Sequence, residues 1–346
     1  MSQRIAYFIP DLRGGGAERS TLNDVNREAA AGKQVDLVLA RAHGPLLSNV
    51  DPRVTIVDLN AHSFSQSILP LSRYLRRSRP SILYSQMMDS GLAAVAARAL
   101  SRHDCRIAST IRSTLSVQAK EVENYSAKGI KRRIARHFAT YVHRKYIDEI
   151  RAVSKGVADD FAAFTGITRS RISVVPNQQN KEDILQKARQ TVVHKWTGTG
   201  NNIVLGVGRL HPAKGFDNLI QAFALVRREI DCKLIILGEG DGRQELEQLV
   251  AELELGPHVD LPGFQQNPYP FMKEASVFVL SSRREGLPGV LSEALLIGTK
   301  VVSIDCKSGP REILDGGRLG ALVPEGDIGA LARAIADNMI TDNKLP

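Results

Sequence analysis

The chain has 346 residues, enough for two ordinary domains with separate hydrophobic cores. Its composition, 43% hydrophobic and 24% charged, is typical of a globular protein and excludes fibrous and intrinsically disordered classes. The formal net charge of +9 is concentrated in residues 1–180, whereas the rest of the chain is mildly acidic, which indicates that the two halves face different partners.

No segment has the pattern of a secretion signal or a membrane span. Residues 1–4 lead directly into an apolar, strand-like stretch, so we expect no signal peptide. The best apolar helical run, residues 91–100, is interrupted by Arg98 and is too short to cross a bilayer. Cys105, Cys232 and Cys306 are widely spaced, which predicts reduced thiols in a cytoplasmic protein rather than disulfides or a metal site.

Short apolar runs alternate with helical patterns along the first half of the chain. Helices are predicted over residues 17–31, 91–101 and 154–164, and strands over residues 5–9, 35–39, 54–57, 82–84, 106–109, 149–153 and 172–175. Residues 180–202 are polar and contain a Gly-Thr-Gly sequence near their end, so we interpret them as a linker with room for one helix. The alternation then resumes, with strands predicted over residues 203–207, 233–237, 277–280 and 301–304.

This alternation on both sides of a linker predicts an α/β protein with two Rossmann-like, doubly wound parallel-sheet domains. The N-terminal domain is expected to span residues 1–180 and the C-terminal domain residues 181–346. Ligands of such sheets bind beyond the carboxyl ends of the strands, so a central cleft between the domains is the expected site.

Two glycine-containing loops follow predicted strands at equivalent positions in the two halves. Residues 14–16 are three glycines ahead of a predicted helix, which allows close backbone approach to a ligand and offers a helix N-terminus to a phosphate; a flexible turn is the alternative. In the second loop, residues 206–215, Arg209 and Lys214 can clamp a diphosphate, with solvated surface cations as the alternative. Neither loop has the glycine spacing of a dinucleotide-binding or Walker motif.

Glu239 and Asp241 are spaced like the acidic pair with which sugar transferases of another fold bind a divalent metal. Glycines surround the pair and a helix follows at once, so a turn with helix-capping acids is the preferred interpretation. No cluster of His, Cys and acidic residues elsewhere has metal-ligand spacing. We therefore expect neither a metal nor another cofactor.

The segment from Glu285 to Glu293 is the most specific feature of the sequence. It follows a predicted strand, opens with glycine and runs into a helix that stops at Gly298. Free backbone amides and the positive potential of a helix N-terminus favour an anion there. Glu285 is placed at that anion and Glu293 about two turns along, where a ribose can bind, although a helix-surface acid is the alternative for Glu293. This arrangement indicates a sugar transferase.

Residues 128–145 contain seven Lys and Arg residues and no acid, among them Lys131, Arg132, Arg133 and Arg136. Apolar residues recur at helical spacing between them, which predicts a basic amphipathic helix suited to an anionic membrane surface. An ordinary half-buried helix with a solvated charged face is the alternative. No aromatic-and-basic reading motif accompanies the helix, so we expect no nucleic-acid partner.

In this order and combination, the segments resemble the retaining glycosyltransferases of family 4, which have the GT-B fold. The resemblance runs nearly from end to end, over residues 14–19, 153–156, 175–177, 208–215, 238–240, 263–264, 285–293 and 308–314. It implies two Rossmann-like domains facing a central cleft, with the nucleotide-sugar held mainly by the second.

The resemblance also implies roles for individual residues. Arg209 and Lys214 neutralise the diphosphate and Glu285 contacts the transferred sugar, which makes these three the catalytic candidates. Glu293 takes the ribose hydroxyls, and the base lies near Gly263 and Phe264. The remaining nucleotide-sugar contacts are expected from Gly15, Gly16, Arg112, Gly208, Glu239, Gly286, Leu287, Pro288, Gly289 and Val290.

The chain departs from the family pattern at two places. Many members carry a His after the strand that here ends at Ser109 and Thr110, whereas this chain has Arg112 at or near that position. Arg cannot deprotonate, which excludes a base role and leaves a contact to the sugar or the acceptor. The chain also stops at Pro346, soon after a helical stretch over residues 327–339, so we expect the family's final crossover helix to be missing.

We therefore expect a metal-independent retaining transferase that moves a hexosyl or N-acetylhexosaminyl group from a nucleoside-diphosphate sugar, with UDP favoured. The expected acceptor is a hydroxyl of a cell-envelope glycan or of a lipid-linked molecule, reached from the inner face of the cytoplasmic membrane. A nucleotide-sugar 2-epimerase of the same fold and a non-catalytic sugar-nucleotide-binding subunit remain alternatives. An NAD-dependent oxidoreductase is disfavoured by the glycine register.

Overall fold

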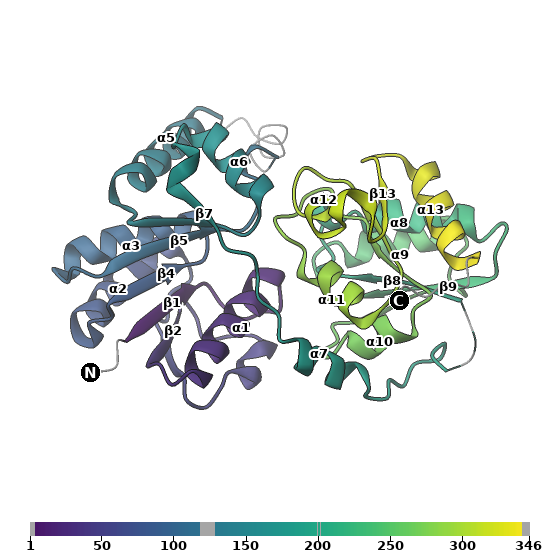
Figure 1. The fold of residues 1–346 in the computed structure, drawn as a ribbon, viewed down its shortest axis with the longest axis horizontal. Helices are drawn as coiled ribbons and strands as arrows, with labels where there is room; N and C mark the ends of the chain where they lie inside the picture. The colour runs from purple at the N-terminus through teal and green to yellow at the C-terminus, as the bar shows by residue number, and fades with distance from the viewer. Residues whose placement is uncertain (1–3, 118–128, 199, 201, 341–346) are drawn as a thin grey trace. The chain divides into compact units, whose positions relative to one another are not determined.

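The computed structural model describes residues 4–117, 129–198, 200 and 202–340, and within residues 129–136 it describes the backbone alone. The chain divides into two compact units, Met1–Gln178 and Gln179–Pro346. Each unit is a parallel β-sheet with helices packed against it (Figure 1). The division falls two residues before the boundary used in the sequence analysis.

Unit 1 contains a seven-stranded parallel sheet in the order β3-β2-β1-β4-β5-β6-β7. The chain leaves β1 in one direction to form β2 and β3, then returns to the other side of β1 to form β4, so the topological switch point lies between β1 and β4. The strands are β1 (Ile5–Ile9), β2 (Val35–Leu39), β3 (Thr55–Asp58), β4 (Ile82–Ser85), β5 (Arg106–Ile111), β6 (Glu149–Ala152) and β7 (Ile172–Val174).

Helices cover both faces of this sheet. Every residue of β1 and β2 is buried, including Asp36 in β2, whose carboxylate accepts from the Tyr74 hydroxyl at 2.6 Å. Phe8 contacts Phe64 of α2 on one face, and Tyr7 on the other face lines a cavity together with Asp24 of α1. The helices are α1 (Gly16–Ala30), α2 (Phe64–Ser78), α3 (Met88–Ser101), α5 (Gly129–Tyr146) and α6 (Lys155–Thr165), with short 3₁₀ turns η1 (Pro45–Asn49) and η2 (Arg169–Arg171).

Unit 2 contains a six-stranded parallel sheet in the order β10-β9-β8-β11-β12-β13. Its switch point lies between β8 and β11, which pair directly. The strands are β8 (Asn202–Val207), β9 (Cys232–Leu237), β10 (Val259–Gly263), β11 (Val277–Leu280), β12 (Val301–Ile304) and β13 (Ala321–Val323).

Two hydrophobic cores lie on the two faces of this sheet, because successive strand residues point to opposite sides. One core contains Val204 and Val279 and packs against α8 (Phe216–Val226), α9 (Arg243–Glu252) and α13 (Ile328–Ile340). The other contains Leu205 and Phe278 and packs against α10 (Tyr269–Glu274) and α11 (Gly289–Ile297). The remaining elements of unit 2 are the short α-helices α7 (Lys181–Ala188) and α12 (Pro310–Ile313) and the 3₁₀ turns η3 (Pro212–Lys214) and η4 (Asp315–Gly317).

The predicted fold class of two doubly wound parallel-sheet domains is therefore confirmed. The one helix expected within residues 180–202 is α7, but this stretch is packed as part of unit 2 and is not a separate linker. Ile184 and Ala188 are the buried residues of α7. Trp196, 8% exposed, belongs to one of the two cores of unit 2. A few apolar side chains at helical spacing anchor a stretch whose overall composition is polar. Within the described residues, every helix is too short or too polar to serve as a bilayer-spanning segment.

Candidate active site

The switch point of unit 2 brings together the loops that follow β8 and β11. These strands are sheet neighbours, and in a parallel sheet the loops that follow two neighbouring strands leave from the same edge. The loop after β8 carries Arg209 and Lys214, and the loop after β11 carries Glu285. All three predicted catalytic residues thus belong to one edge of one sheet.

Lys214 and Glu285 form an ion pair at this edge. Lys214 Nζ donates to Glu285 Oε1 at 2.6 Å, although the residues are 71 positions apart in the sequence. The Lys214 side chain is 28% exposed and that of Glu285 is 10% exposed, so water screens the pair only in part. A partly accessible ammonium group held beside a carboxylate can exchange its partner for an incoming anion. The side chain of Arg209 is exposed on the same loop.

Arg283 fixes the two loops to each other. Its amide donates to the Ala213 carbonyl at 2.9 Å, and its guanidinium donates to both carboxylate oxygens of Asp217, in the first turn of α8, at 2.9 and 2.5 Å. Burial raises the pKa of Asp217, but the hydrogen bonds and charge of Arg283 outweigh burial and hold that pKa below 3.8. The sequence analysis did not single out Arg283, because nothing in its spacing indicates that it contacts residues about 70 positions away.

Gly215 is required where the two loops touch. Its φ of +61° lies in the left-handed region, and a Cβ built on it would lie 2.2 Å from the Ser281 carbonyl oxygen. Ser281 Oγ also donates to the Lys214 carbonyl at 2.9 Å. Only a residue without a side chain permits this close approach, so Gly215 sets the position from which Lys214 reaches Glu285.

The turn before α11 is held in the same way by the loop after β12. Ser308 Oγ donates to the Gly286 carbonyl at 2.9 Å. Gly309 has φ +95°, and a Cβ there would lie 2.6 Å from Pro288 Cδ. The N-cap residue of α11 is Pro288, which makes no side-chain capping hydrogen bond, and the helix begins at Gly289. The first amides of this helix and its positive end are therefore presented beside the Lys214–Glu285 pair.

Glu293 lies on α11 and is 8% exposed, so the alternative of a helix-surface acid is wrong. Gly208, Glu239, Gly263 and Phe264 follow or end β8, β9 and β10, at the same sheet edge as the pair. The Glu239 carboxylate accepts from Arg243 Nη2 at 2.7 Å and from Nε at 3.0 Å. The predicted turn is present, but the expected capping role is not: the N-cap of α9 is Gly242, which makes no side-chain capping hydrogen bond, and Glu239 instead pairs with the side chain of Arg243.

Cys306 is a buried thiol near Glu285. Burial, followed by the nearby charge of Glu285, raises the pKa of its thiol to about 12, so the thiol stays protonated at neutral pH. Within the part of the chain that the structure describes, no three His, Cys, Asp or Glu side chains are grouped so that they could hold a metal ion.

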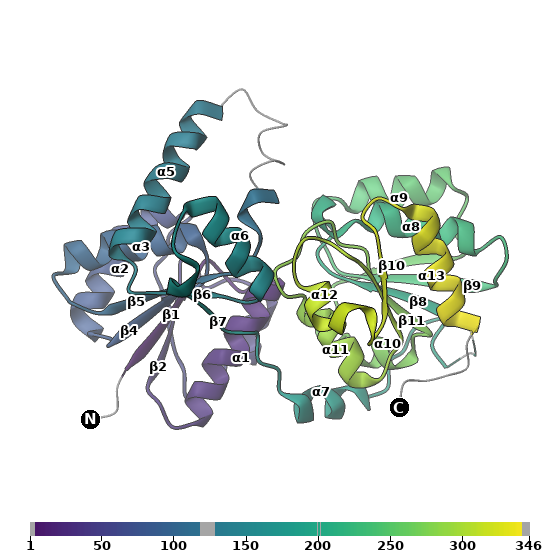
Figure 2. The same ribbon diagram turned by 45° about the horizontal axis from the view of Figure 1, so that its top comes forward.

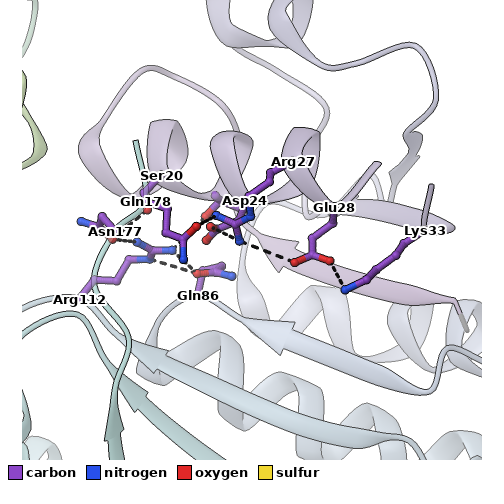
Figure 3. Close-up of polar contacts among 10 residues, drawn as sticks. Ser20, Asp24, Arg27, Glu28, Lys33, Gln86, Arg112, Asn177 and Gln178 are labelled. Carbon is purple, nitrogen blue, oxygen red and sulfur yellow. Dashed lines mark hydrogen bonds and ion pairs between the residues drawn. The ribbon is translucent and has the colours of Figure 1, made fainter. Parts of the chain in front are cut away.

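In unit 1, Arg112 is the centre of a polar network (Figure 3). It follows β5 directly and donates from Nε and Nη2 to Gln86 Oε1, at 3.0 and 2.5 Å, and from Nη1 to Asn177 Oδ1, at 2.9 Å. A fourth bond runs from Nη2 to Thr21 Oγ1 at 3.5 Å. A guanidinium has five N–H donors, so a single Nη1–H remains for the predicted contact with sugar or acceptor.

The network ties α1 to the chain segment that leaves the sheet. Ser20 Oγ donates to Asn177 Oδ1 at 2.8 Å, and Arg27 donates to Gln178 Oε1 at 2.7 Å (Figure 3). Burial raises the pKa of Asp24, which lies beside Arg27, while the charges of Arg112 and Arg27 oppose that rise. These contacts fix the helix that begins at the triple glycine: Gly15 is its N-cap and Gly16 its first residue.

The predicted basic helix is α5, but Lys131, Arg132, Arg133 and Arg136 lie outside the residues whose side chains the structure describes.

Two family models match the chain. The model for glycosyl transferases group 1 matches residues 191–346, and the model for the glycosyl transferase 4-like domain matches residues 15–178. The chain belongs to the glycosyltransferases of group 1. The match over residues 15–178 ends where unit 1 ends, and the match over residues 191–346 lies wholly within unit 2, so each unit corresponds to one family domain.

Two curated relatives illustrate the similarity. An uncharacterized glycosyltransferase of Methanocaldococcus jannaschii is 29% identical over 245 residues, which cover 70% of this chain and 60% of the relative. The N-acetylgalactosamine-N,N'-diacetylbacillosaminyl-diphospho-undecaprenol 4-alpha-N-acetylgalactosaminyltransferase of Campylobacter jejuni is 35% identical over 192 residues, which cover 56% of this chain and 50% of the relative. The matches thus span one half to three fifths of these relatives' lengths.

Solved structures of glycosyltransferases share the fold. Anabaena HepE in complex with UDP-glucose superposes with a TM-score of 0.79 at 19% identity, covering 97% of this chain and 90% of HepE. Sucrose-phosphate synthase of Thermosynechococcus elongatus superposes with a TM-score of 0.77 at 20% identity, covering 97% of this chain and 89% of that protein. The predicted GT-B class is confirmed by these likenesses.

Proposed function

We propose that this group 1 glycosyltransferase transfers a sugar, with retention of anomeric configuration, from a UDP-sugar to a hydroxyl of a cell-envelope glycan or lipid-linked acceptor. The observation that carries the proposal is the Lys214–Glu285 pair, 2.6 Å apart at the switch point of unit 2, in which Glu285 belongs to the loop that leads into the N-terminus of α11 at Gly289. A cation and a positive helix end suit a diphosphate, and a carboxylate suits sugar hydroxyls.

In the proposed reaction, Lys214 leaves Glu285 and binds the donor diphosphate, supported by Arg209 and the first amides of α11. Glu285 then accepts hydrogen bonds from the hydroxyls of the transferred sugar. The bond between the anomeric carbon and the β-phosphate oxygen breaks, and the acceptor oxygen bonds to that carbon from the same face. The acceptor proton passes to the departing phosphate, so UDP leaves with the proton and the charges balance.

Front-face attack is favoured because the sequence presents no pair of a covalent nucleophile and its base. Electrostatic stabilisation of the leaving group is the main contribution expected from the protein. UDP is supported by the fold shared with HepE, which was solved with UDP-glucose. A lipid-linked or lipopolysaccharide-type acceptor is supported by the named activity of the Campylobacter relative and by a lipopolysaccharide core glycosyltransferase of Rhizobium meliloti, 33% identical over 178 residues.

We further propose that the enzyme works as a peripheral protein on the cytoplasmic face of the membrane, with the basic helix α5 on the acceptor side. The support is the run of Lys and Arg between residues 128 and 145.

The test is a transfer assay with a panel of labelled UDP-sugars and soluble glycan acceptors, with the anomeric configuration of the product read by NMR. The proposal expects one donor to be consumed only when acceptor is present and a product with the donor's configuration. Isomerisation of the donor without acceptor would instead identify an epimerase, and UDP binding without any turnover would identify a non-catalytic subunit. An inverted product would overturn the retaining mechanism.

A further inference from the structure

Exposed aromatic side chains are concentrated on a single helix. Among the described residues, the only Phe, Tyr or Trp side chains counted as exposed are Phe138, Tyr141 and Tyr146, which are 62%, 51% and 40% exposed. All three belong to the last turns of α5. Phe138 and Tyr141 are three residues apart and share one face of the helix with position 145. Figure 2 shows α5 on the outside of unit 1, next to α3.

The opposite face of α5 is fixed in the core, so the aromatic side cannot turn inward. Ala139, Val142 and His143 are buried. Burial lowers the pKa of His143, and its ring is held by Ser109 Oγ, 3.2 Å from Nε2, and by the Ala139 carbonyl, 2.9 Å from Nδ1. A neutral ring with both nitrogens occupied anchors this side of the helix to β5.

Cations accompany the exposed aromatic rings. Lys145 Nζ lies 5.6 Å from the centre of the Tyr141 ring and 5.5 Å from that of Tyr146, and it donates to the Tyr141 hydroxyl at 3.1 Å. Arg144 is exposed beside it, and Arg171 donates to the Arg144 carbonyl at 2.9 Å. Rings with an apolar body and a polar edge, mixed with Lys and Arg, match the headgroup level of a bilayer.

We infer that the aromatic–basic face of α5, formed by Phe138, Tyr141, Arg144, Lys145 and Tyr146, docks on an anionic lipid bilayer. Phe138 enters the boundary between headgroups and acyl chains, and the cations meet lipid phosphates. The occupant is assigned by charge complementarity and by the confinement of the exposed rings to this face. The inference deepens the membrane contact of the proposed function, to which it adds the inserting side chains, and it requires no turnover.

Vesicle sedimentation tests the inference without donor or acceptor. The protein is expected to sediment with vesicles of phosphatidylcholine and phosphatidylglycerol and to remain in solution with phosphatidylcholine alone. Phe138→Ser should weaken binding about tenfold at both low and high salt, because its contribution is apolar. Arg144→Gln with Lys145→Gln should weaken binding roughly fivefold per cation at low salt and less at high salt. The matched controls on α2, Leu69→Ser (59% exposed) and Arg76→Gln with Arg77→Gln, should leave binding unchanged.

Insertion itself is read with Phe138→Trp, whose fluorescence brominated lipids should quench. The native Trp196, buried in unit 2, serves as the unquenched reference. Transfer to a soluble acceptor without vesicles should be unaffected by any of these variants, which separates this inference from the proposed function. The inference is overturned if the α2 controls lose as much vesicle binding as the α5 variants, or if brominated lipids do not quench the fluorescence of Phe138→Trp. It is also overturned if the protein binds single-stranded polynucleotide and the α5 variants weaken that binding.

Discussion

Removing the charge of Lys214 and removing the charge of Glu285 should have different effects on donor binding and turnover. We consider Lys214→Met and Glu285→Gln, which keep the approximate size of each side chain and remove its charge. The ammonium group of Lys214 donates to the Glu285 carboxylate at 2.6 Å. The donor diphosphate must therefore compete with Glu285 for Lys214, and removing the carboxylate charge removes that competition.

The expected magnitudes follow from this competition. Lys214→Met removes a charge-assisted hydrogen bond to the diphosphate, on the order of 1.5–3 kcal/mol, so UDP should bind roughly 10- to 100-fold more weakly. Turnover should fall by about 10²–10³. Glu285→Gln should leave UDP affinity unchanged or raise it a few-fold, while turnover falls by about 10² because the sugar contact is lost. Lys214→Met should also lower the free energy of unfolding by about 1–3 kcal/mol, since Glu285, 10% exposed, loses its partner.

Calorimetric titration of UDP, initial rates of transfer and urea denaturation measure these three quantities. Lys187→Met is the matched control, because Lys187 pairs with Asp183 at 2.7 Å on α7 and both side chains are about 40% exposed. In Lys187→Met, UDP affinity and the transfer rate should change by no more than a few-fold, and the free energy of unfolding should change little. If Glu285→Gln weakened UDP binding as much as Lys214→Met does, the competition between carboxylate and diphosphate would be refuted.

Three further predictions concern the residues around the pair. Gly215→Ala should destabilise the protein by about 1–3 kcal/mol in urea denaturation and weaken UDP binding, because its Cβ meets the Ser281 carbonyl oxygen; unchanged UDP affinity would show that this approach does not position the site. Cys306, with a thiol pKa of about 12, should resist iodoacetamide at pH 7–8 in the folded protein and react in urea, and rapid native alkylation would contradict its burial. Burial raises the pKa of Asp217, but Arg283 outweighs burial and holds the folded-state pKa below 3.8. The contribution of this carboxylate to stability is therefore complete above pH 3.8 and is lost as the pH falls through the lower folded-state pKa. Asp217→Asn should therefore flatten the acid side of the stability profile, and an unchanged profile would count against the Asp217–Arg283 contact.

The strands were predicted well wherever they are long and apolar. The runs at residues 5–9, 35–39, 277–280 and 301–304 have the bounds found in the structure, because strands buried on both faces have mostly apolar sequences. β10 and β13 were not predicted. β10 contains Pro262 and Gly263, residues disfavoured in strands, and β13 has only three residues. Both are edge strands, and each pairs with a single neighbour, β9 or β12.

The residue types of the candidate site could be read from motifs, but their contacts could not. Arg209, Lys214 and Glu285 were identified from loops that follow strands, and the sheet order then brought these loops to one edge. The direct bond between Lys214 and Glu285 and the role of Arg283 depend on side-chain contacts across about 70 residues. No local pattern specifies such contacts. The hydrogen bonds of Arg112 to Gln86, Asn177 and Thr21 could not be predicted either, because these partners come from three separate segments.

The central claim, that Lys214 and the N-terminus of α11 bind the donor through its diphosphate, is tested most directly by comparing UDP with uridine in calorimetric titrations. The account predicts that UDP binds at least about 100-fold more tightly than uridine and that this difference shrinks roughly 10- to 100-fold in Lys214→Met. Equal binding of UDP and uridine to the native protein, or a difference that persists in full in Lys214→Met, would contradict it.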